Sequence, residues 1–267
     1  MTLPSIDREF EGKTAFVLGG SSGIGRASAE LLADRGARVV IVGHAEDTLT
    51  VAAELSDNGK RSVIGIHGDG SDSGFVRSAV DRTVSEFGSL DIIMCSAAIH
   101  PLGNVVETDE ATWDRTFAVN VKSMYLTCHF GVPHMIESGG GSIITVASVQ
   151  ATSNTPNVCA YASTKGAIVT FTHTLAIDLA KHKIRANTIC PGSIITPMQE
   201  HFARGNGEGK SIEDMYKVFA RPVPLQRLGE AWEIAELAAF LASPRSGFCT
   251  GSQFTADGGL LAGLRIF

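Results

Sequence analysis

Short apolar runs recur along the chain, and between them lie longer segments in which apolar residues follow a helical period. Seven runs predict β-strands, at 14–18, 38–42, 61–66, 91–95, 142–147, 184–190 and 252–256. The segments between them predict helices over 24–35, 46–57, 73–87, 109–137, 159–181 and 230–242. The runs do not alternate apolar with polar residues, which is typical of strands covered on both faces. Strands that alternate with helices in this way predict an α/β fold with a doubly wound parallel sheet of about seven strands.

One stretch interrupts the alternation. Residues 191–229 contain three glycines between 205 and 209 and then Pro222 and Pro224, and they predict a short irregular lid. No internal repeat, low-complexity tract or linker divides the chain, so we expect residues 1–267 to form one domain.

A glycine-rich turn follows the first predicted strand. Glycines at 19, 23 and 25 let the backbone turn sharply and approach a pyrophosphate closely. The helix that begins beside them offers free N–H groups and a positive dipole end to that anion. Such a turn can also be purely structural, and its Gly-x-x-x-Gly-x-Gly spacing differs from the Gly-x-Gly-x-x-Gly of other dinucleotide folds.

Tyr161 and Lys165 lie one turn apart on the predicted helix 159–181, and Ser148 closes a predicted strand. Side chains at positions i and i+4 share a helix face, and an ammonium group beside a phenol lowers the pKa of the phenol. The pair therefore predicts proton transfer next to a redox cofactor. The spacing also occurs by chance, as a half-buried tyrosine beside a solvated lysine, but the glycine turn in the same chain favours the catalytic interpretation.

In their order and spacing these features resemble the short-chain dehydrogenase/reductase family over roughly residues 10–260. The residues that carry the resemblance are the glycine turn 19–25, Asp69, Asn120, Ser148, Tyr161, Lys165, Pro191-Gly192 and Asp257-Gly258-Gly259. The resemblance implies a Rossmann-type fold and an NAD(P)-dependent oxidoreductase that interconverts a secondary alcohol and a ketone.

The resemblance also implies a role for each catalytic residue. Tyr161 is the acid/base, Ser148 orients the substrate oxygen, and Lys165 holds the ribose hydroxyls and lowers the pKa of Tyr161. Asn120 supports a water that relays protons through Lys165. The implied cofactor-binding residues are Gly19, Ser21, Ser22, Gly23, Ile24, Gly25, His44, Asp69, Ala97, Tyr161, Lys165, Pro191, Gly192, Ile194 and Thr196. In isolation, Ser148 would be a loop cap and Asn120 a buried amide that braces helix 109–137.

The chain departs from the family pattern at two places. Leu18 stands where a threonine is usual, and Cys95-Ser96-Ala97-Ala98 replaces the usual Asn-Asn-Ala-Gly. The usual asparagines brace the central sheet near the adenosine side of the cofactor. We therefore expect cofactor packing, and not the proton-transfer residues, to differ here.

The choice between NAD and NADP depends on the end of the second predicted strand. NAD selection usually needs an acidic residue there, but this chain has Gly43 followed by His44. A missing carboxylate removes repulsion of a 2′-phosphate, and a neutral imidazole attracts that phosphate only weakly. We expect a slight preference for NADP that weakens as the pH rises and imidazole loses its proton. The alternative is that His44 is merely an exposed turn residue.

The substrate is indicated by two segments that point to different chemistry. Residues 149–158 are rich in hydrogen-bonding side chains, and together with His100 they favour a sugar or polyol; a solvated loop would have the same composition. The substrate-binding residues expected on this basis are Ser148, Gln150, Tyr161 and His100. The lid residues Met198, Phe202, Met215, Tyr216 and Phe219 would instead cover an apolar ketone, or would only pack the lid.

Composition and charge narrow the function classes. Hydrophobic residues make up 44% and charged residues 19% of the chain, as in soluble globular enzymes. The net charge of -6 gives no indication of the basic surface that binds nucleic acid. Without an apolar leader or an 18-residue apolar stretch, we expect no membrane association and a cytoplasmic location. The five cysteines are widely spaced and the histidines form no ligand pair, so we expect neither a disulfide framework nor a metal.

Three function classes remain open. An alcohol dehydrogenase or ketone reductase is favoured, an epimerase or dehydratase on the same scaffold is the second, and a non-catalytic nucleotide-binding protein is the third. A pure binder has no need of the four catalytic residues. The expected partner is a small alcohol or ketone, and the resemblance implies a homotetramer that uses helices 109–137 and 159–181 and the C-terminal tail.

Overall fold

The computed structural model describes residues 6–207 and 209–263. Three sets of residues that entered our expectations lie outside the described residues. They are 1–5 of the N-terminal segment expected to lack an apolar leader, 208 in the lid, and 264–267 of the tail expected to join subunits.

Seven of the strands in the described residues form one parallel sheet, in the order β3-β2-β1-β4-β5-β6-β9. The strands are β1 (Thr14–Leu18), β2 (Arg38–Gly43), β3 (Val63–His67), β4 (Ile92–Cys95), β5 (Gly141–Val146), β6 (Ile184–Pro191) and β9 (Gln253–Ala256). Each corresponds to a predicted strand, with bounds that differ by up to two residues. This order confirms the predicted doubly wound, Rossmann-type sheet.

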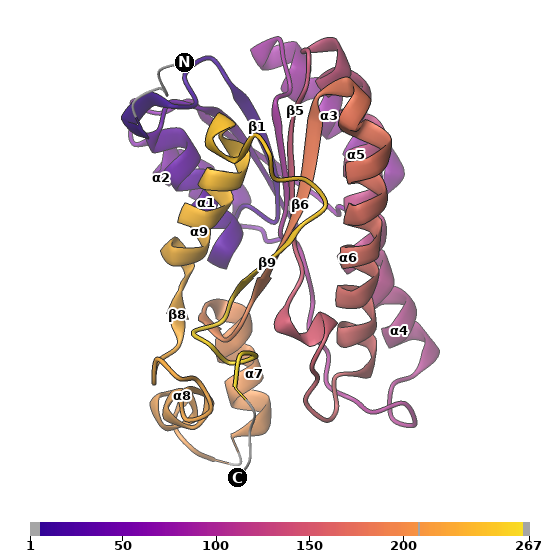
Figure 1. Ribbon diagram of the computed structural model, residues 1–267, viewed down its shortest axis with the longest axis vertical. Helices are drawn as coiled ribbons and strands as arrows, with labels where there is room; N and C mark the ends of the chain where they lie inside the picture. Colours follow the sequence, from indigo (N-terminus) through magenta and orange to yellow (C-terminus); the bar gives the residue numbers. More distant parts are fainter. Residues whose placement is uncertain (1–5, 208, 264–267) are drawn as a thin grey trace.

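Helices cover both faces of the sheet (Figure 1). One face packs against α1 (Gly23–Asp34), α2 (Thr48–Ser56) and α9 (Ala231–Ala242), and the other against α3 (Ser73–Phe87), α5 (Ser123–Glu137) and α6 (Cys159–Leu179). Successive strand residues point to opposite faces, so Val17 belongs to the first of the two cores and Phe16 to the second. This is why the strands read as continuous apolar runs. None of the described helices has the length and apolarity needed to cross a bilayer.

The lid is more regular than expected. It contains β7 (Ile194–Ile195), α7 (Pro197–Asn206) and α8 (Ile212–Ala220), and β7 pairs with β8 (Gly229–Glu230). The prediction of an irregular stretch was wrong because it rested on the glycines and prolines, whereas the segment also carries residues that cap helices. Thr196 and Ser211 each accept a hydrogen bond from a backbone N–H in the first turn of the helix that follows.

The predicted helix 109–137 is divided. It begins as α4 (Glu110–Phe117), passes through a π-helical turn (Ala118–Lys122) and continues as α5. Single π-turns inside α-helices are frequent at functional sites. This turn carries Asn120, which is fully buried.

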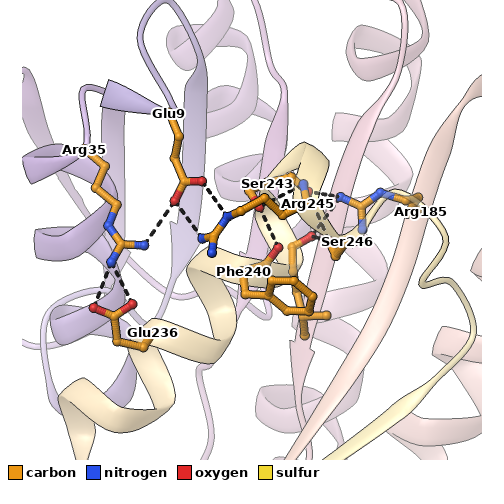
Figure 2. A network of polar contacts seen from close by, with 9 residues as sticks. Glu9, Arg35, Arg185, Glu236, Phe240, Ser243, Arg245 and Ser246 are labelled. Atoms are coloured by element: carbon orange, nitrogen blue, oxygen red, sulfur yellow. Dashed lines mark hydrogen bonds and ion pairs between the residues drawn. The ribbon is translucent and has the colours of Figure 1, made fainter. Parts of the chain in front are cut away.

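A buried ion network joins the two ends of the sequence on the α1/α9 side of the sheet. The side chain of Glu9 is fully buried and binds two guanidinium groups, that of Arg35 at the end of α1 and that of Arg245 after α9 (Figure 2). Arg35 also binds Glu236 of α9, whose side chain is 48% exposed. The network therefore ties the segment before β1 to α1 and α9.

We predict that Glu9→Gln lowers the free energy of unfolding by about 3 kcal/mol, because loss of the buried carboxylate leaves the largely buried Arg245 without its anionic partner and Arg35 with Glu236 alone. Glu236→Gln is the matched control, since it alters the same Arg35 at an exposed position and costs at most about 1 kcal/mol. Urea unfolding measures both variants. Equal losses of unfolding free energy in the two variants would show that the buried Glu9 carboxylate stabilises the fold no more than the exposed Glu236 carboxylate does.

Candidate active site

The glycine turn is held tightly between β2 and β4. Gly19 has φ +81, and a Cβ there would stand 2.5 Å from the backbone nitrogen of Ala97. The Gly19 N–H donates to the carbonyl of Val42 at 2.7 Å, and the Ala97 N–H donates to that of Leu18 at 3.1 Å. No other residue fits at 19 without displacing the loop after β4. The turn therefore brings bare backbone to the N-terminus of α1.

One cavity of about 630 Å³ extends along the carboxyl ends of the strands. It is lined by the glycine turn, by the loop after β4, and by Ser148, Tyr161 and Lys165. Of the residues expected to bind cofactor or substrate, all but Gly25 contribute to its lining; Gly25 is buried against Gly19. The volume is in the range of small-molecule and cofactor sites.

The three expected catalytic side chains converge at one end of this cavity. Lys165 is only 2% exposed, and its Nζ donates to the carbonyl of Val146 at 3.0 Å and lies 5.2 Å from the centre of the Tyr161 ring. Ser148 Oγ accepts a hydrogen bond from the N–H of Gln150 at 3.1 Å. The helix spacing and the strand end have therefore brought the phenol, the ammonium group and the hydroxyl together, as the sequence predicted.

Burial dominates the acid–base properties of the pair. It raises the pKa of Tyr161 to about 12, and the hydrogen bond with Ser148 only partly opposes this shift. Burial also lowers the pKa of Lys165 to about 8. The expected lowering of the tyrosine pKa by Lys165 is not seen: the two causes of the shift are burial of the phenol and the hydrogen bond with Ser148. Tyr161 is therefore a neutral phenol at physiological pH.

Asn120 does not line the cavity and is held by protein groups. Its amide nitrogen donates to the Ile99 carbonyl and to Thr164 Oγ1, both at 3.0 Å, and its Oδ1 accepts from the Ile99 N–H at 2.8 Å. Thr164 in turn donates to the backbone carbonyl of Tyr161. These contacts brace the loop after β4 against α6. The water relay stays a prediction.

At the opposite end of the cavity, Asp69 is held by an arginine that no sequence motif indicates. Arg115 of α4 donates to Asp69 Oδ2 and to Ser71 Oγ, both at 2.9 Å. Burial works against ionisation of Asp69, but hydrogen bonds from Ser71 and Arg115 lower its pKa to about 2. A single arginine on a polar helix face usually indicates a solvated side chain, so this contact across 46 residues had no sequence signal.

The end of β2 is crowded by two hydroxyl groups at Gly43. A Cβ there would lie 2.5 Å from Ser21 Oγ and 2.6 Å from Thr48 Oγ1. His44 is exposed and also lines the cavity, with the ring of His67 stacked at 6.3 Å. A side chain at 43 would therefore require the Ser21 and Thr48 hydroxyls to move.

The unusual loop after β4 is packed with small groups. Cys95 is buried, and a hydrogen bond with Cys128 together with burial raises the pKa of its thiol. Leu18 is also buried and packs under Gly70. Ser96, Ala97 and Ala98 line the cavity. The thiol and the leucine therefore fill the core as apolar groups, as cysteine usually does. All five cysteines are free, and no cluster of three metal-ligating side chains occurs among the described residues.

The substrate end combines polar and aromatic walls. The His100 ring lies 3.9 Å from the Tyr161 ring and 4.8 Å from that of Phe202, measured between ring centres. Of the lid residues selected from the sequence, Met198, Phe202 and Phe219 line the cavity. Met215 and Tyr216 do not: Met215 is buried, and Tyr216 lines a separate surface groove.

Comparison with known proteins gives a consistent result over nearly the whole chain. A family model described as Enoyl-(Acyl carrier protein) reductase matches residues 19–261. A Caenorhabditis elegans protein named dehydrogenase/reductase SDR family member 4 is 37% identical over 98% of this chain and 100% of its own length. An oxidoreductase of Thermotoga maritima is 36% identical over 95% of this chain and 99% of its own.

A solved structure is also similar. The aldohexose dehydrogenase of Thermoplasma acidophilum superposes with a TM-score of 0.89 at 30% sequence identity, and the match covers 97% of this chain and 98% of that one. Fold and sequence therefore point to the same group of proteins.

We predict that the buried Lys165 makes stability rise with pH. The folded protein releases this proton at about pH 8, against an ordinary value of 10.5, so between these values the unfolded chain binds more protons. The free energy of unfolding of the wild type should gain roughly 3 kcal/mol relative to Lys165→Met across this interval. Urea unfolding of both proteins at about pH 7 and at about pH 10 measures it. A difference that does not change with pH would contradict a buried, destabilised ammonium group.

Proposed function

Since this chain belongs to the short-chain dehydrogenase/reductase family of oxidoreductases, we propose that it interconverts a secondary alcohol and a ketone with NAD(P) as cofactor and Tyr161 as the acid/base. One observation carries the proposal: the glycine turn and the Ser148, Tyr161 and Lys165 side chains line the same cavity. A phosphate cradle and a proton-transfer group are thus within reach of one bound dinucleotide.

The cavity fits a nicotinamide dinucleotide. The bare backbone at Gly19 and the N-terminus of α1 would receive the pyrophosphate, Asp69 and His44 the adenosine half, and Lys165 the ribose next to the reaction. When bound, the nicotinamide supplies or accepts the hydride.

The protein groups then handle the proton. Tyr161 keeps its proton at neutral pH because its pKa is about 12, so it is ready to donate to a carbonyl oxygen that Ser148 orients. In the opposite direction the phenolate accepts the proton of the substrate hydroxyl.

We further propose NADP as the preferred cofactor. The space that an acidic side chain would need at Gly43 is occupied by the hydroxyls of Ser21 and Thr48. A 2′-phosphate would therefore meet hydroxyl groups and the His44 imidazole and no carboxylate at position 43, and a phosphate accepts hydrogen bonds from hydroxyls.

The proposed substrate is a hydroxylated small molecule such as a sugar or polyol. Two observations support this: His100 and Gln150 line the cavity beside Tyr161, and the similar solved structure is that of an aldohexose dehydrogenase. A homotetramer and a cytoplasmic location are also proposals. The exposed Tyr125 on α5 and Ile177 on α6 support the subunit contacts expected for those helices.

We predict that Tyr161→Phe abolishes turnover while cofactor affinity stays within a few-fold of the wild type. The ring is retained but the proton donor is lost, and general acid catalysis is worth roughly 10²–10⁴ in rate. Steady-state assays and fluorescence titration with NADPH measure the two effects. A variant that kept as much as about a tenth of the wild-type rate would contradict the assignment of Tyr161 as acid/base.

The cofactor proposal predicts an effect of charge at position 44. The ratio of the dissociation constants for NADH and NADPH should exceed one in the wild type, and His44→Arg should raise it several-fold because a guanidinium group pairs with the 2′-phosphate. His44→Asp should lower the ratio below one, since a carboxylate repels that phosphate and accepts from a ribose hydroxyl. Fluorescence titration with the two cofactors measures the ratios, and equal ratios in all three proteins would contradict a role for His44.

A further inference from the structure

Two buried polar atoms beside Tyr161 make no hydrogen bond of normal geometry with any residue that the structure describes. They are His100 Nδ1 and Gln150 Oε1; both residues line the cavity, and their side chains lie close enough to interact weakly with each other. A buried polar group left poorly satisfied costs up to roughly 1–3 kcal/mol, so two such groups at a ligand cavity favour a ligand group that bonds to both.

Both side chains are held in place by neighbours. The Gln150 amide nitrogen donates to Thr155 Oγ1 at 3.2 Å, and the Gln150 N–H donates to Ser148 Oγ. The residue before His100 is Ile99, whose N–H and carbonyl are both bound by Asn120. The unsatisfied atoms therefore belong to a preorganised part of the site.

The pair carries no charge at physiological pH. Burial lowers the pKa of His100 to about 4; a weak hydrogen-bonding contact with the Gln150 side chain opposes this shift, while Lys165 and His201 add to it. A neutral imidazole offers one donor and one acceptor, and an amide oxygen offers an acceptor. A hydroxyl group, which both donates and accepts, satisfies such a pair. A carboxylate or phosphate, which only accepts, would face the amide oxygen without a proton to give.

The position of the pair relates it to the reacting atoms. The reacting oxygen of the substrate contacts Tyr161 and Ser148 in the proposed function. The centre of the His100 ring lies 3.9 Å from that of the Tyr161 ring, and the backbone N–H of Gln150 donates to Ser148 Oγ, which places the Gln150 backbone next to that hydroxyl. An oxygen that contacts His100 and Gln150 is therefore close to the reacting oxygen, as are two oxygens on adjacent carbons.

We propose, resting on the oxidoreductase function above, that His100 and Gln150 bind a hydroxyl group on the carbon next to the reacting carbon. The enzyme then selects vicinal diols and α-hydroxy ketones over simple alcohols and ketones. Phe202 forms the apolar wall on the other side of His100.

The test compares 2,3-butanediol with 2-butanol, which share a carbon skeleton. Both are titrated calorimetrically into protein saturated with NADPH, where no turnover occurs. The wild type should bind the diol about tenfold more tightly, the worth of one or two neutral hydrogen bonds. His100→Leu and Gln150→Leu should each bring the two affinities within about threefold. NADPH titration of each variant checks that it is folded.

A matched pair of variants tests the support of Gln150. Thr155→Ser keeps the hydroxyl that accepts the Gln150 amide and should keep the preference for the diol, whereas Thr155→Val should weaken it. Equal affinities in the wild type, or binding of the diol too weak to measure, would overturn the inference and show that His100 and Gln150 satisfy each other.

Turnover measured separately with NADPH and 2-butanone or 3-hydroxy-2-butanone distinguishes the two proposals. A preference for diol binding without turnover of either ketone contradicts the proposed function and leaves the hydroxyl site standing. Turnover with equal affinities contradicts the hydroxyl site alone.

Discussion

The hydrogen bond from Lys165 Nζ to the Val146 carbonyl is the contact on which the site depends. It joins α6 to the end of β5. Ser148 follows that strand end by two residues and Tyr161 precedes the lysine by one helical turn, so this bond fixes the hydroxyl and the phenol relative to each other. The ammonium group is almost completely buried, and the carbonyl offsets part of the cost of removing it from water. The lowered pKa of Lys165 reflects the part of that cost that the carbonyl does not offset.

The parallel sheet supplies the frame in which this contact works. The carboxyl ends of neighbouring parallel strands open at the same edge, so the glycine turn after β1, the loop after β4 and Ser148 after β5 meet around one cavity. Two sets of contacts hold the loops that follow these strands. They are the close backbone approach of Gly19 to Ala97 and the hydrogen bonds of Asn120 with Ile99. The polar groups that make full hydrogen bonds hold the site in place. His100 Nδ1 and Gln150 Oε1, which do not, mark the place where we propose that a substrate hydroxyl binds.

Local rules predicted much of this from the sequence. Apolar runs gave the strands, and the spacing of Tyr161 and Lys165 placed both on one helix face. Features that depend on distant contacts were not predictable. The helices of the lid were hidden by its glycines, no pattern marks the π-turn at Asn120, and Arg115 meets Asp69 across 46 residues. The direction of the Tyr161 pKa shift was also not predictable, since i,i+4 spacing indicates a nearby charge but not the burial that raises this pKa.

The central claim is that a hydride leaves the carbon whose oxygen Tyr161 and Ser148 hold. Incubation of the protein with oxidised cofactor and 2,3-butanediol deuterated at its carbinol carbons tests it most directly, followed by mass spectrometry of the cofactor and the diol. The account predicts reduced cofactor that carries one deuterium and a product ketone that has lost one. Deuterium lost to solvent while the diol epimerises or loses water, with the cofactor unlabelled, would contradict it and assign the scaffold to non-redox chemistry.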